Sequence, residues 1–342
     1  MFMRRTTLLS LAAVAYAAHV PMVARKVGAT TPVLEPFVDA LPLPGRLRPV
    51  GLHQRPGFPA GLLYEVNARQ VAQKLHRDLS ATTVWGYQGS YPGPTIAAVT
   101  GQPVYVRYRN QLPGGEHPLW SPAFACVHGP DTSDPPGARR IVAHLHGGKV
   151  PADSDGFPEA TILPGQTQSP VFFYPNRQEA ATLWYHDHGL GITRLNVMMG
   201  LAAFYILHDP FELLLPLPRG RYDVPLAIQD RSFNADGSLS YPTELEPEFF
   251  GDVMLVNGKV WPYLDVDRAK YRLRLLNGCN SRFLQLRFRN GAPFRQIASE
   301  QGLLPKPEPR TTITLGPGER ADIVVDFAAF AASAASFAAT SA

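Results

Sequence analysis

Thr182-Leu183-Trp184-Tyr185-His186-Asp187-His188 is an apolar run that ends in a His-x-His pair, and Ile141-Val142-Ala143-His144-Leu145-His146 is a second run of the same kind. Short apolar runs of this type predict β-strands. Side chains at positions i and i+2 of a strand point to the same face, so each pair presents two imidazoles side by side. Two such strands brought together would present four imidazoles, which indicates a metal site.

The composition favours a turn-rich, all-β protein. The 342 residues suffice for two domains, include 34 Pro and 29 Gly, and only 18% of them are charged. The net charge is +4, and Lys and Arg are scattered rather than clustered, so we expect no nucleic-acid partner. No apolar stretch reaches the roughly 20 residues that cross a bilayer as a helix, so we expect no transmembrane span.

Apolar segments separated by turn residues recur along the chain, which predicts two successive Greek-key β-sandwiches. The strands expected in the first sandwich are residues 62–66, 83–86, 103–108, 140–146, 171–174, 182–188 and 201–207. Those expected in the second are residues 224–229, 254–256, 271–276, 283–288 and 322–327. The Pro-rich residues 209–221 predict a linker, so we place the first domain at residues 30–212 and the second at 213–342. Asn257-Gly258 between apolar residues predicts a tight hairpin.

The N-terminal residues have the layout of a bacterial export signal. Arg4-Arg5 precede the apolar residues 8–15, and Ala15-Tyr16-Ala17 matches a small-residue cleavage site. We interpret residues 1–29 as an export signal and leader, which predicts an exported protein, and the paired arginines indicate the twin-arginine route. The alternative interpretation is an uncleaved N-terminal segment.

The C-terminal residues and the cysteines leave two structural questions open. Residues 336–341 predict either the closing strand of the second sandwich or a loose tail. Cys126 and Cys279 lie in different predicted domains, and neither has a neighbouring Cys or His. One disulfide is conceivable after export, but we expect buried or inert thiols because spacing alone cannot place them within bonding range.

The surroundings of the two His-x-His pairs strengthen the prediction of a metal site. Imidazole suits copper, zinc, iron and nickel. Gly147-Gly148 follow the first pair and allow a sharp turn beside it. Asp187 alternates to the opposite face of its strand, which favours a supporting or structural role. The other side chains that could attract attention are expected to be ordinary or part of the core: His76, His128, His208, Met198 and Met199.

These residues resemble the first domain of multicopper oxidases, nearest to bacterial spore-coat laccases and bilirubin oxidases. The resemblance covers nearly everything after residue 29. In the first domain it is carried by residues 75–79, 85–87, 92–96, 144–148, 153–156, 183–188 and 193–196. In the second domain it is carried by residues 255–264 and by Gly316-Pro317-Gly318-Glu319-Arg320. The resemblance implies an all-β fold of two consecutive cupredoxin-like Greek-key β-sandwich domains and a copper cofactor.

The resemblance also implies individual roles. His144 would bind the type 2 copper, His146 and His186 would share one type 3 copper, and His188 would bind the other. Asp155 resembles an acidic residue that relays protons during oxygen reduction. The alternative for Asp155 is a loop residue that caps the Asp-Gly turn. The family reaction is the oxidation of phenolic or tetrapyrrole small molecules with reduction of dioxygen to water.

The sequence departs from the family pattern in one respect. A third cupredoxin domain supplies four more histidines and the type 1 copper site, whose signature is a His-Cys-His run. Here no His follows His208, and Cys279 has no imidazole nearby in the sequence. We therefore expect half of the trinuclear ligand set, no type 1 site and weak or absent oxidase activity for this chain alone. A third domain supplied in trans is a possible partner.

Two other classes of function are weighed against this one. A non-catalytic copper-binding or scaffold cupredoxin protein would keep the fold without turnover, although the four retained histidines argue against a copper-free scaffold. A metallohydrolase would also use His-x-His at a strand end, but its barrel needs further downstream histidines and helices that alternate with strands. The sequence shows neither feature, so the hydrolase is disfavoured.

Overall fold

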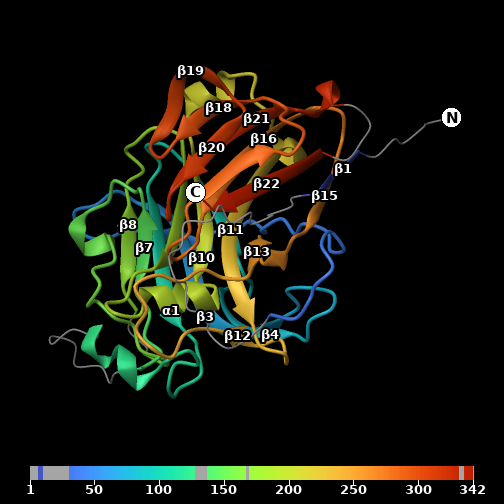
Figure 1. Ribbon diagram of the computed structural model, residues 1–342. Coiled ribbons are helices and arrows are strands. Elements are labelled where there is room, and N and C mark those ends of the chain that lie inside the picture. Colours follow the sequence, from blue (N-terminus) through green and yellow to red (C-terminus); the bar gives the residue numbers. More distant parts are fainter. Residues whose placement is uncertain (1–6, 11–30, 128–136, 167–168, 331–334, 342) are drawn as a thin grey trace.

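Strands dominate the computed structural model of the chain (Figure 1). The structure describes residues 7–10, 31–127, 137–166, 169–330 and 335–341, and for 7–10 and 335–341 it describes the backbone alone. Of the predicted export signal and leader, residues 1–29, only residues 7–10 are therefore described, and His128 lies outside the described residues. No helix among the residues described is long and apolar enough to span a membrane.

The first sandwich consists of a five-stranded and a four-stranded sheet. The five-stranded sheet has the order β2 (Gly51–His53), β3 (Gly61–Gln73), β6 (Val104–Asn110) and β8 (Val171–Tyr174), with β4 (Thr82–Tyr87) also paired to β3. The four-stranded sheet has the order β5 (Gly93–Val99), β10 (Ala202–His208), β9 (Ala181–Asp187) and β7 (Ala143–His146). The second of these sheets carries both His-x-His pairs.

The second sandwich consists of an eight-stranded and a five-stranded sheet. The larger sheet has the order β14 (Lys259–Val260), β13 (Val253–Val256), β11 (Asp223–Phe233), β16 (Lys270–Asn277), β21 (Arg320–Asp326), β18 (Phe294–Ser299) and β19 (Gly302–Arg310), with β12 (Leu239–Ser240) paired to β11. The smaller sheet has the order β15 (Tyr263–Val266), β1 (Thr7–Ser10), β22 (Ala335–Ser341), β17 (Leu284–Phe288) and β20 (Thr312–Leu315). Strand β19 forms an edge of its sheet and carries proline at positions 305, 307 and 309.

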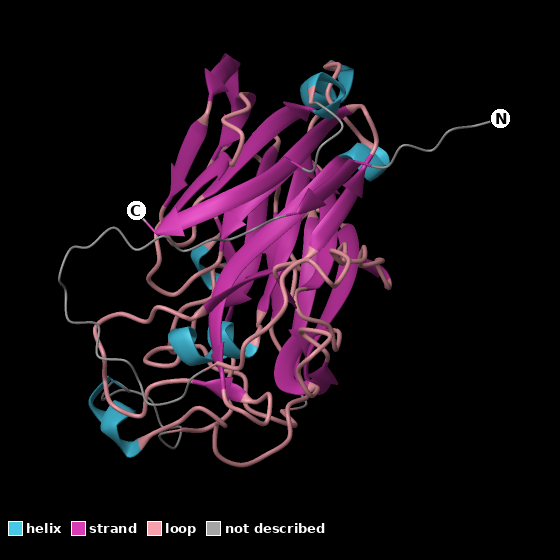
Figure 2. Ribbon diagram, turned by 45° about the vertical axis from the view of Figure 1, so that its right-hand side comes forward, coloured by secondary structure: helices cyan, strands magenta, loops and turns pink. Residues whose placement is uncertain are grey.

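Helices are short and lie in the connections between strands, as Figure 2 shows. The α-helices are α1 (Thr193–Met199) and α2 (Pro210–Leu214), and the 3₁₀-helices are η1 (Pro122–Val127), η2 (Ala152–Ser154), η3 (Gly220–Tyr222) and η4 (Phe327–Ala329). The predicted linker 209–221 thus contains α2. Asp209 caps this helix by accepting a hydrogen bond from the Glu212 N–H at 2.6 Å, and Pro210 occupies its first turn.

The all-β prediction is confirmed. The Asn257-Gly258 hairpin forms between β13 and β14. Strand β22 pairs with β17 and β1, so the closing-strand alternative for residues 336–341 is correct. The strand predicted over residues 140–146 is shorter, because regular pairing with β9 begins at Ala143. The domain ranges 30–212 and 213–342 stay predictions.

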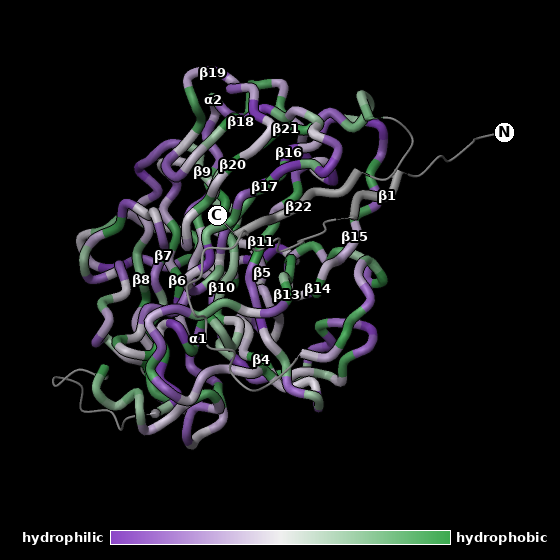
Figure 3. Tube along the Cα trace, in the orientation of Figure 1, coloured by the Kyte–Doolittle hydropathy of each residue, from purple (hydrophilic) through white to green (hydrophobic). Residues whose placement is uncertain are grey.

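Strands β9 and β10 are buried on both faces, which explains their continuous apolar runs. On one face Leu183, Tyr185 and Tyr205 enter the core of the first sandwich. On the other face a separate cluster joins the two sandwiches: Trp184, Ala202, Phe204, Ile206, Ala227 and Leu276. The strand that carries His186 is therefore fixed between two cores. Along the chain as a whole, Figure 3 shows apolar and polar residues alternating in short stretches rather than gathering in one long apolar segment.

A buried ion-pair network also joins the two sandwiches. Arg272 on β16 contacts Glu212 of α2 and bonds Asp322 on β21 at 2.6 Å. Asp322 also accepts a hydrogen bond from the Thr182 hydroxyl at 2.7 Å, and that hydroxyl accepts one from Arg274 at 2.9 Å. Burial alone would raise the pKa of Glu212, but hydrogen bonds from His208 and Arg272 outweigh it and lower this pKa to about 2. Removing one partner would leave a buried charge uncompensated.

We expect Glu212→Gln to lower the free energy of unfolding at pH 7 by on the order of 3 kcal/mol. Folding lowers the pKa of Glu212 from 4.5 to about 2, so its stabilisation is complete above about pH 4.5 and is lost as the pH falls towards 2. The difference between Glu212→Gln and the unmodified chain should therefore shrink on acidification. Denaturant unfolding at pH 7, 5 and 3 measures it, with Glu116→Gln at an exposed site as the control. A difference that stays constant with pH would contradict the assignment.

Candidate metal centre

The two His-x-His pairs lie side by side because β7 and β9 are adjacent antiparallel strands. Their register places His144 opposite His186 and His146 opposite Trp184. His188 follows the end of β9, and its ring centroid lies 5.0 Å from that of His144. Four further ring pairs, His144–His146, His144–His186, His146–His186 and His186–His188, have centroids 5.4 to 5.9 Å apart. The structure thus brings together all four histidines predicted from the sequence.

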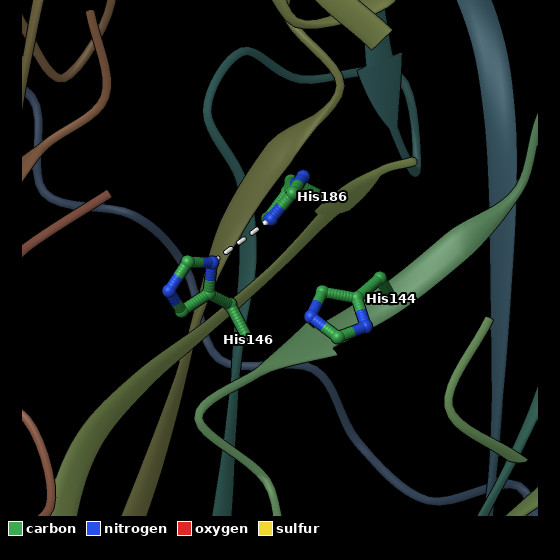
Figure 4. Close-up of side chains that lie close together, drawn as sticks. All are labelled: His144, His146 and His186. Atoms are coloured by element: carbon green, nitrogen blue, oxygen red, sulfur yellow. Dashed lines mark hydrogen bonds between the residues drawn. The ribbon is translucent and has the colours of Figure 1, made fainter. Parts of the chain in front are cut away.

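Three of these histidines direct ring nitrogens into a common space. One donor atom from each of His144, His146 and His186 lies within 4.8 Å of the others. The closest pair is His146 Nδ1 and His186 Nε2, which are 3.2 Å apart and share the hydrogen bond that the dashed line in Figure 4 marks. Two nitrogen ligands on one tetrahedral metal ion are about 3.3 Å apart, given metal–nitrogen distances of about 2.0 Å. This pair therefore has the separation of two ligands to a single ion.

Backbone carbonyls set the tautomers of two rings. His144 Nδ1 donates to the Asp155 carbonyl at 2.5 Å, and His186 Nδ1 donates to the Asp187 carbonyl at 2.8 Å. Each of these rings is left with an unprotonated Nε2, the form that binds metal. His188 Nδ1 is buried and has no hydrogen-bond partner among the described residues. An unpartnered buried nitrogen beside three other imidazoles is consistent with a ligand.

Burial favours the neutral form of the rings, which is the form that binds metal. Burial lowers the pKa of His146 to about 4, with a further contribution from the nearby Arg320 guanidinium. Burial also lowers the pKa of His144, and that of His186 falls well below its usual value. Protons therefore compete weakly with a metal ion at these nitrogens.

Trp184 packs against both rings of the closest pair. Its indole stacks on His186 with ring centroids 4.0 Å apart and on His146 with centroids 5.3 Å apart. Trp184 is 4% exposed, so it shields one side of the pair from water. The sequence places Trp184 beside the second pair, and the strand spacing predicts the stacking, because Trp184 lies two residues before His186 and therefore on the same face.

The two acidic residues near the histidines occupy different environments. The Asp155 side chain is 52% exposed, and its Oδ1 lies 3.5 Å from His144 Nδ1. Asp187 is fully buried, and its two oxygens accept hydrogen bonds from the backbone N–H groups of Val142 (2.8 Å) and Gly189 (3.0 Å). Burial raises the pKa of Asp187 to about 6, although these hydrogen bonds oppose the rise. Asp187 thus ties β9 to the segment before β7.

The other residues considered in the sequence lie away from the centre. His76 is buried and bonds the Glu35 carbonyl at 2.9 Å, and His208 pairs with Glu212 at 3.0 Å. Met198 and Met199 are buried in α1, as expected. Cys126 and Cys279 are free thiols, which excludes a disulfide between them in this structure. Cys279 is buried as expected, but Cys126 is exposed, because η1 lies on the surface and directs Cys126 outward.

The second sandwich also reaches the centre, which the sequence analysis did not foresee. Gly318, in the turn before β21, lies against the His146 ring. Arg320 is 1% exposed and donates to the Thr182 carbonyl on β9 at 3.1 Å. In the sequence, residues 316–320 carry only a family resemblance. Their place beside His146 depends on how the two sandwiches pack together.

Comparison with known proteins agrees with this geometry. The multicopper oxidase sequence profile matches residues 70–120 and 138–212. A laccase of Bacillus subtilis is 44% identical over 315 residues, covering 87% of this chain and 60% of the laccase. The chain belongs to the multicopper oxidase family. A laccase of Haloferax volcanii is 40% identical over 346 residues, covering 95% of this chain and 58% of that protein.

Solved structures of multicopper oxidases share the fold. The laccase of Pediococcus acidilactici superimposes with a TM-score of 0.72 at 29% identity, covering 91% of this chain and 63% of that chain. The McoA multicopper oxidase of Aquifex aeolicus gives a TM-score of 0.68 at 31% identity, covering 86% and 58% respectively. The expected cupredoxin-like sandwich fold is thereby confirmed. The chain spans about 60% of the length of the curated laccases it matches.

Copper is the cofactor of this multicopper oxidase family, and the residues present fit it. The donor set consists of neutral imidazoles, which suit copper, and the buried His188 nitrogen lacks another partner among the residues that the structure describes. The 3.2 Å separation of His146 Nδ1 and His186 Nε2 meets the requirement for two ligands on one ion.

We expect Asp187→Ala to lower the free energy of unfolding by about 3 kcal/mol, because it leaves two buried N–H groups without acceptors. Thermal and denaturant unfolding of the metal-free chain measure the change. Asp265→Ala, which removes an exposed carboxylate on β15, serves as the control and should stay within about 0.5 kcal/mol of the unmodified chain. Equal stabilities of the two variants would show that the Asp187 hydrogen bonds do not hold the strands together.

Proposed function

We propose that this chain supplies four imidazole ligands to the copper cluster of an oxidoreductase that oxidises phenolic or tetrapyrrole small molecules and reduces dioxygen to water. The observation that carries the proposal is the convergence of His144, His146, His186 and His188 from two adjacent strands, with one pair of nitrogens 3.2 Å apart. The second support is membership of the multicopper oxidase family. The chain covers 60% of the length of the Bacillus subtilis laccase, so the complete laccase reaction is proposed for this chain and is not shown by the match.

The proposed ligand assignment follows the family pattern. His146 and His186 share one type 3 copper, His188 binds the other type 3 copper, and His144 binds the type 2 copper. The separation of His146 Nδ1 and His186 Nε2 favours the shared ion. These four histidines amount to half of a trinuclear ligand set. We propose that the type 1 copper is not held by the described residues, because no His follows His208 in this sequence and Cys279 is buried.

Bound copper would supply the electron-transfer chemistry by which the substrate is oxidised and oxygen is reduced. The chain's own residues would prepare the site for it. Carbonyls of Asp155 and Asp187 hold two rings in the metal-binding tautomer, and Trp184 excludes water from the His146–His186 pair. The Asp155 carboxylate is half exposed and lies 3.5 Å from His144 Nδ1, which suits it to pass protons between solvent and the site.

We expect the purified chain to bind copper, and the double variant His146→Ala/His186→Ala to lose most of that binding. Copper(II) titration against a chelator of known affinity, with metal analysis of the dialysed protein, measures the effect. His76→Ala removes a histidine outside the centre and serves as the matched control. Copper retained equally by the double variant and the unmodified chain would refute the proposed site.

Turnover separates an incomplete oxidase from a non-catalytic copper-binding cupredoxin. We expect the copper-loaded chain alone to oxidise a phenolic dye slowly or not at all, because four imidazoles spread over three copper positions leave each ion few ligands. A separately expressed third domain from a related laccase, added in trans, should restore copper-dependent oxidation. Copper binding with no restored oxidation would favour the non-catalytic alternative, and rapid oxidation by the chain alone would contradict the half-site assignment.

We further propose that the chain is exported by the twin-arginine route. The support is Arg4-Arg5 ahead of the apolar residues 8–15. A fusion of residues 1–30 to a reporter that is active only outside the cytoplasm should be active, and Arg4→Lys/Arg5→Lys should silence it. Export that persists in the double variant would argue for a different route.

A further inference from the structure

The turn before β21 contacts a proposed copper ligand of the other sandwich. A Cβ atom placed on Gly318 would lie 3.1 Å from Cε1 of His146, closer than ordinary van der Waals contact. Gly318 has a φ of +83°, so glycine is favoured here on backbone grounds as well. The absence of a side chain therefore leaves just enough room for the imidazole.

Hydrogen bonds to β16 anchor the turn that contacts His146. Asn277 at the end of β16 is fully buried, and its carbonyl accepts a hydrogen bond from the Gly318 N–H at 2.8 Å. The Asn277 N–H donates to the Glu319 carbonyl at 3.0 Å, and its side-chain amide donates to the Leu315 carbonyl at 2.9 Å. Within the turn, the Glu319 N–H donates to the Gly316 carbonyl at 3.0 Å. Residues on both sides of Gly318 are thus anchored to one strand.

His146 in turn has little freedom to shift. Trp184 stacks on the His146 ring. The Nδ1 atom of His146 lies 3.2 Å from Nε2 of His186, and Figure 4 shows these two histidines. The following residue, Gly147, packs on Arg320, since a Cβ atom there would lie 2.6 Å from Nη2 of the guanidinium. Arg320 is itself fixed by hydrogen bonds to the Thr182 and Glu300 carbonyls at 3.1 and 3.0 Å. Any displacement of the imidazole therefore alters its position relative to His186.

We propose that Gly318 is a positioning residue, through which the second sandwich sets the orientation of His146 for copper. The contact makes the geometry of the His146–His186 pair depend on how the two sandwiches are packed, although Gly318 offers no ligand atom. A side chain at position 318 would push the ring by a few tenths of an ångström. Mutation of the residues that surround and orient a metal ligand costs about 10- to 100-fold in metal affinity. This inference rests on the proposed copper site.

The test compares glycine substitutions at two positions that both have a positive φ, Gly318 at +83° and Gly291 at +71°. Gly318→Ala and Gly318→Asn each place a Cβ atom against His146, and asparagine tolerates a positive φ better than alanine does. Gly291, in the turn between β17 and β18, has a φ of +71°, and a Cβ atom placed there would have no other atom within 4 Å, so Gly291→Ala and Gly291→Asn impose the strain without the contact. Copper(II) is titrated into each full-length variant against a chelator, and the visible copper spectrum is recorded. Near-UV circular dichroism and unfolding check the fold.

We expect both substitutions at Gly318 to weaken copper binding by about 10-fold and to change the visible spectrum, while both at Gly291 keep the affinity and spectrum of the unmodified chain. If Gly318→Ala fails to fold, Gly318→Asn decides the matter. Unchanged copper affinity and spectrum in the Gly318 variants would overturn the inference, as would equal weakening at Gly291. Failure of the unmodified chain to bind copper would instead refute the proposed function.

Discussion

The antiparallel register between β7 and β9 is the constraint on which the site depends. It sets His144 opposite His186 and His146 opposite Trp184, so that the two His-x-His pairs share one face. A shift of one residue in this register would turn one pair to the opposite face of the sheet. Asp187 stabilises this register. Its side chain accepts hydrogen bonds from the backbone N–H groups of Val142 and Gly189 on the face opposite to the histidines. The residue between His186 and His188 thus stabilises the register that brings the two His-x-His pairs together.

The packing of the two sandwiches extends this constraint. Strand β9 contributes Leu183 and Tyr185 to the core of the first sandwich and Trp184 to the cluster between the sandwiches. Thr182, at the start of the same strand, joins the buried network of Arg272, Arg274 and Asp322. Both apolar burial and buried charge therefore fix β9 against the second sandwich. The second sandwich is a structural support of the His cluster as well as a neighbouring unit.

Much of the fold and the core of the site could be predicted from the sequence, because both rest on local periodicity. The i, i+2 spacing of the histidines gave their common face, and short apolar runs gave β6, β8 and β10. The sequence pattern does not predict β19, because prolines are unusual in strands, and it does not predict α2, because a Pro-rich segment favours a linker. The Asp209-Pro210 cap could have indicated that helix. The contacts of Gly318 and Arg320 with the His146 segment could not be predicted, since they arise from residues more than 170 positions away in the chain.

The prolines of β19 have a consequence for association between molecules. Proline has no N–H group, so positions 305, 307 and 309 remove three donors from this edge strand, whose pairing with β18 also shifts register between Leu303 and Glu308. Proline is tolerated in strands where the missing donor faces away from the neighbouring strand. This edge of the eight-stranded sheet therefore offers fewer donors to an incoming strand, and prolines and irregular pairing on an edge strand disfavour edge-to-edge aggregation.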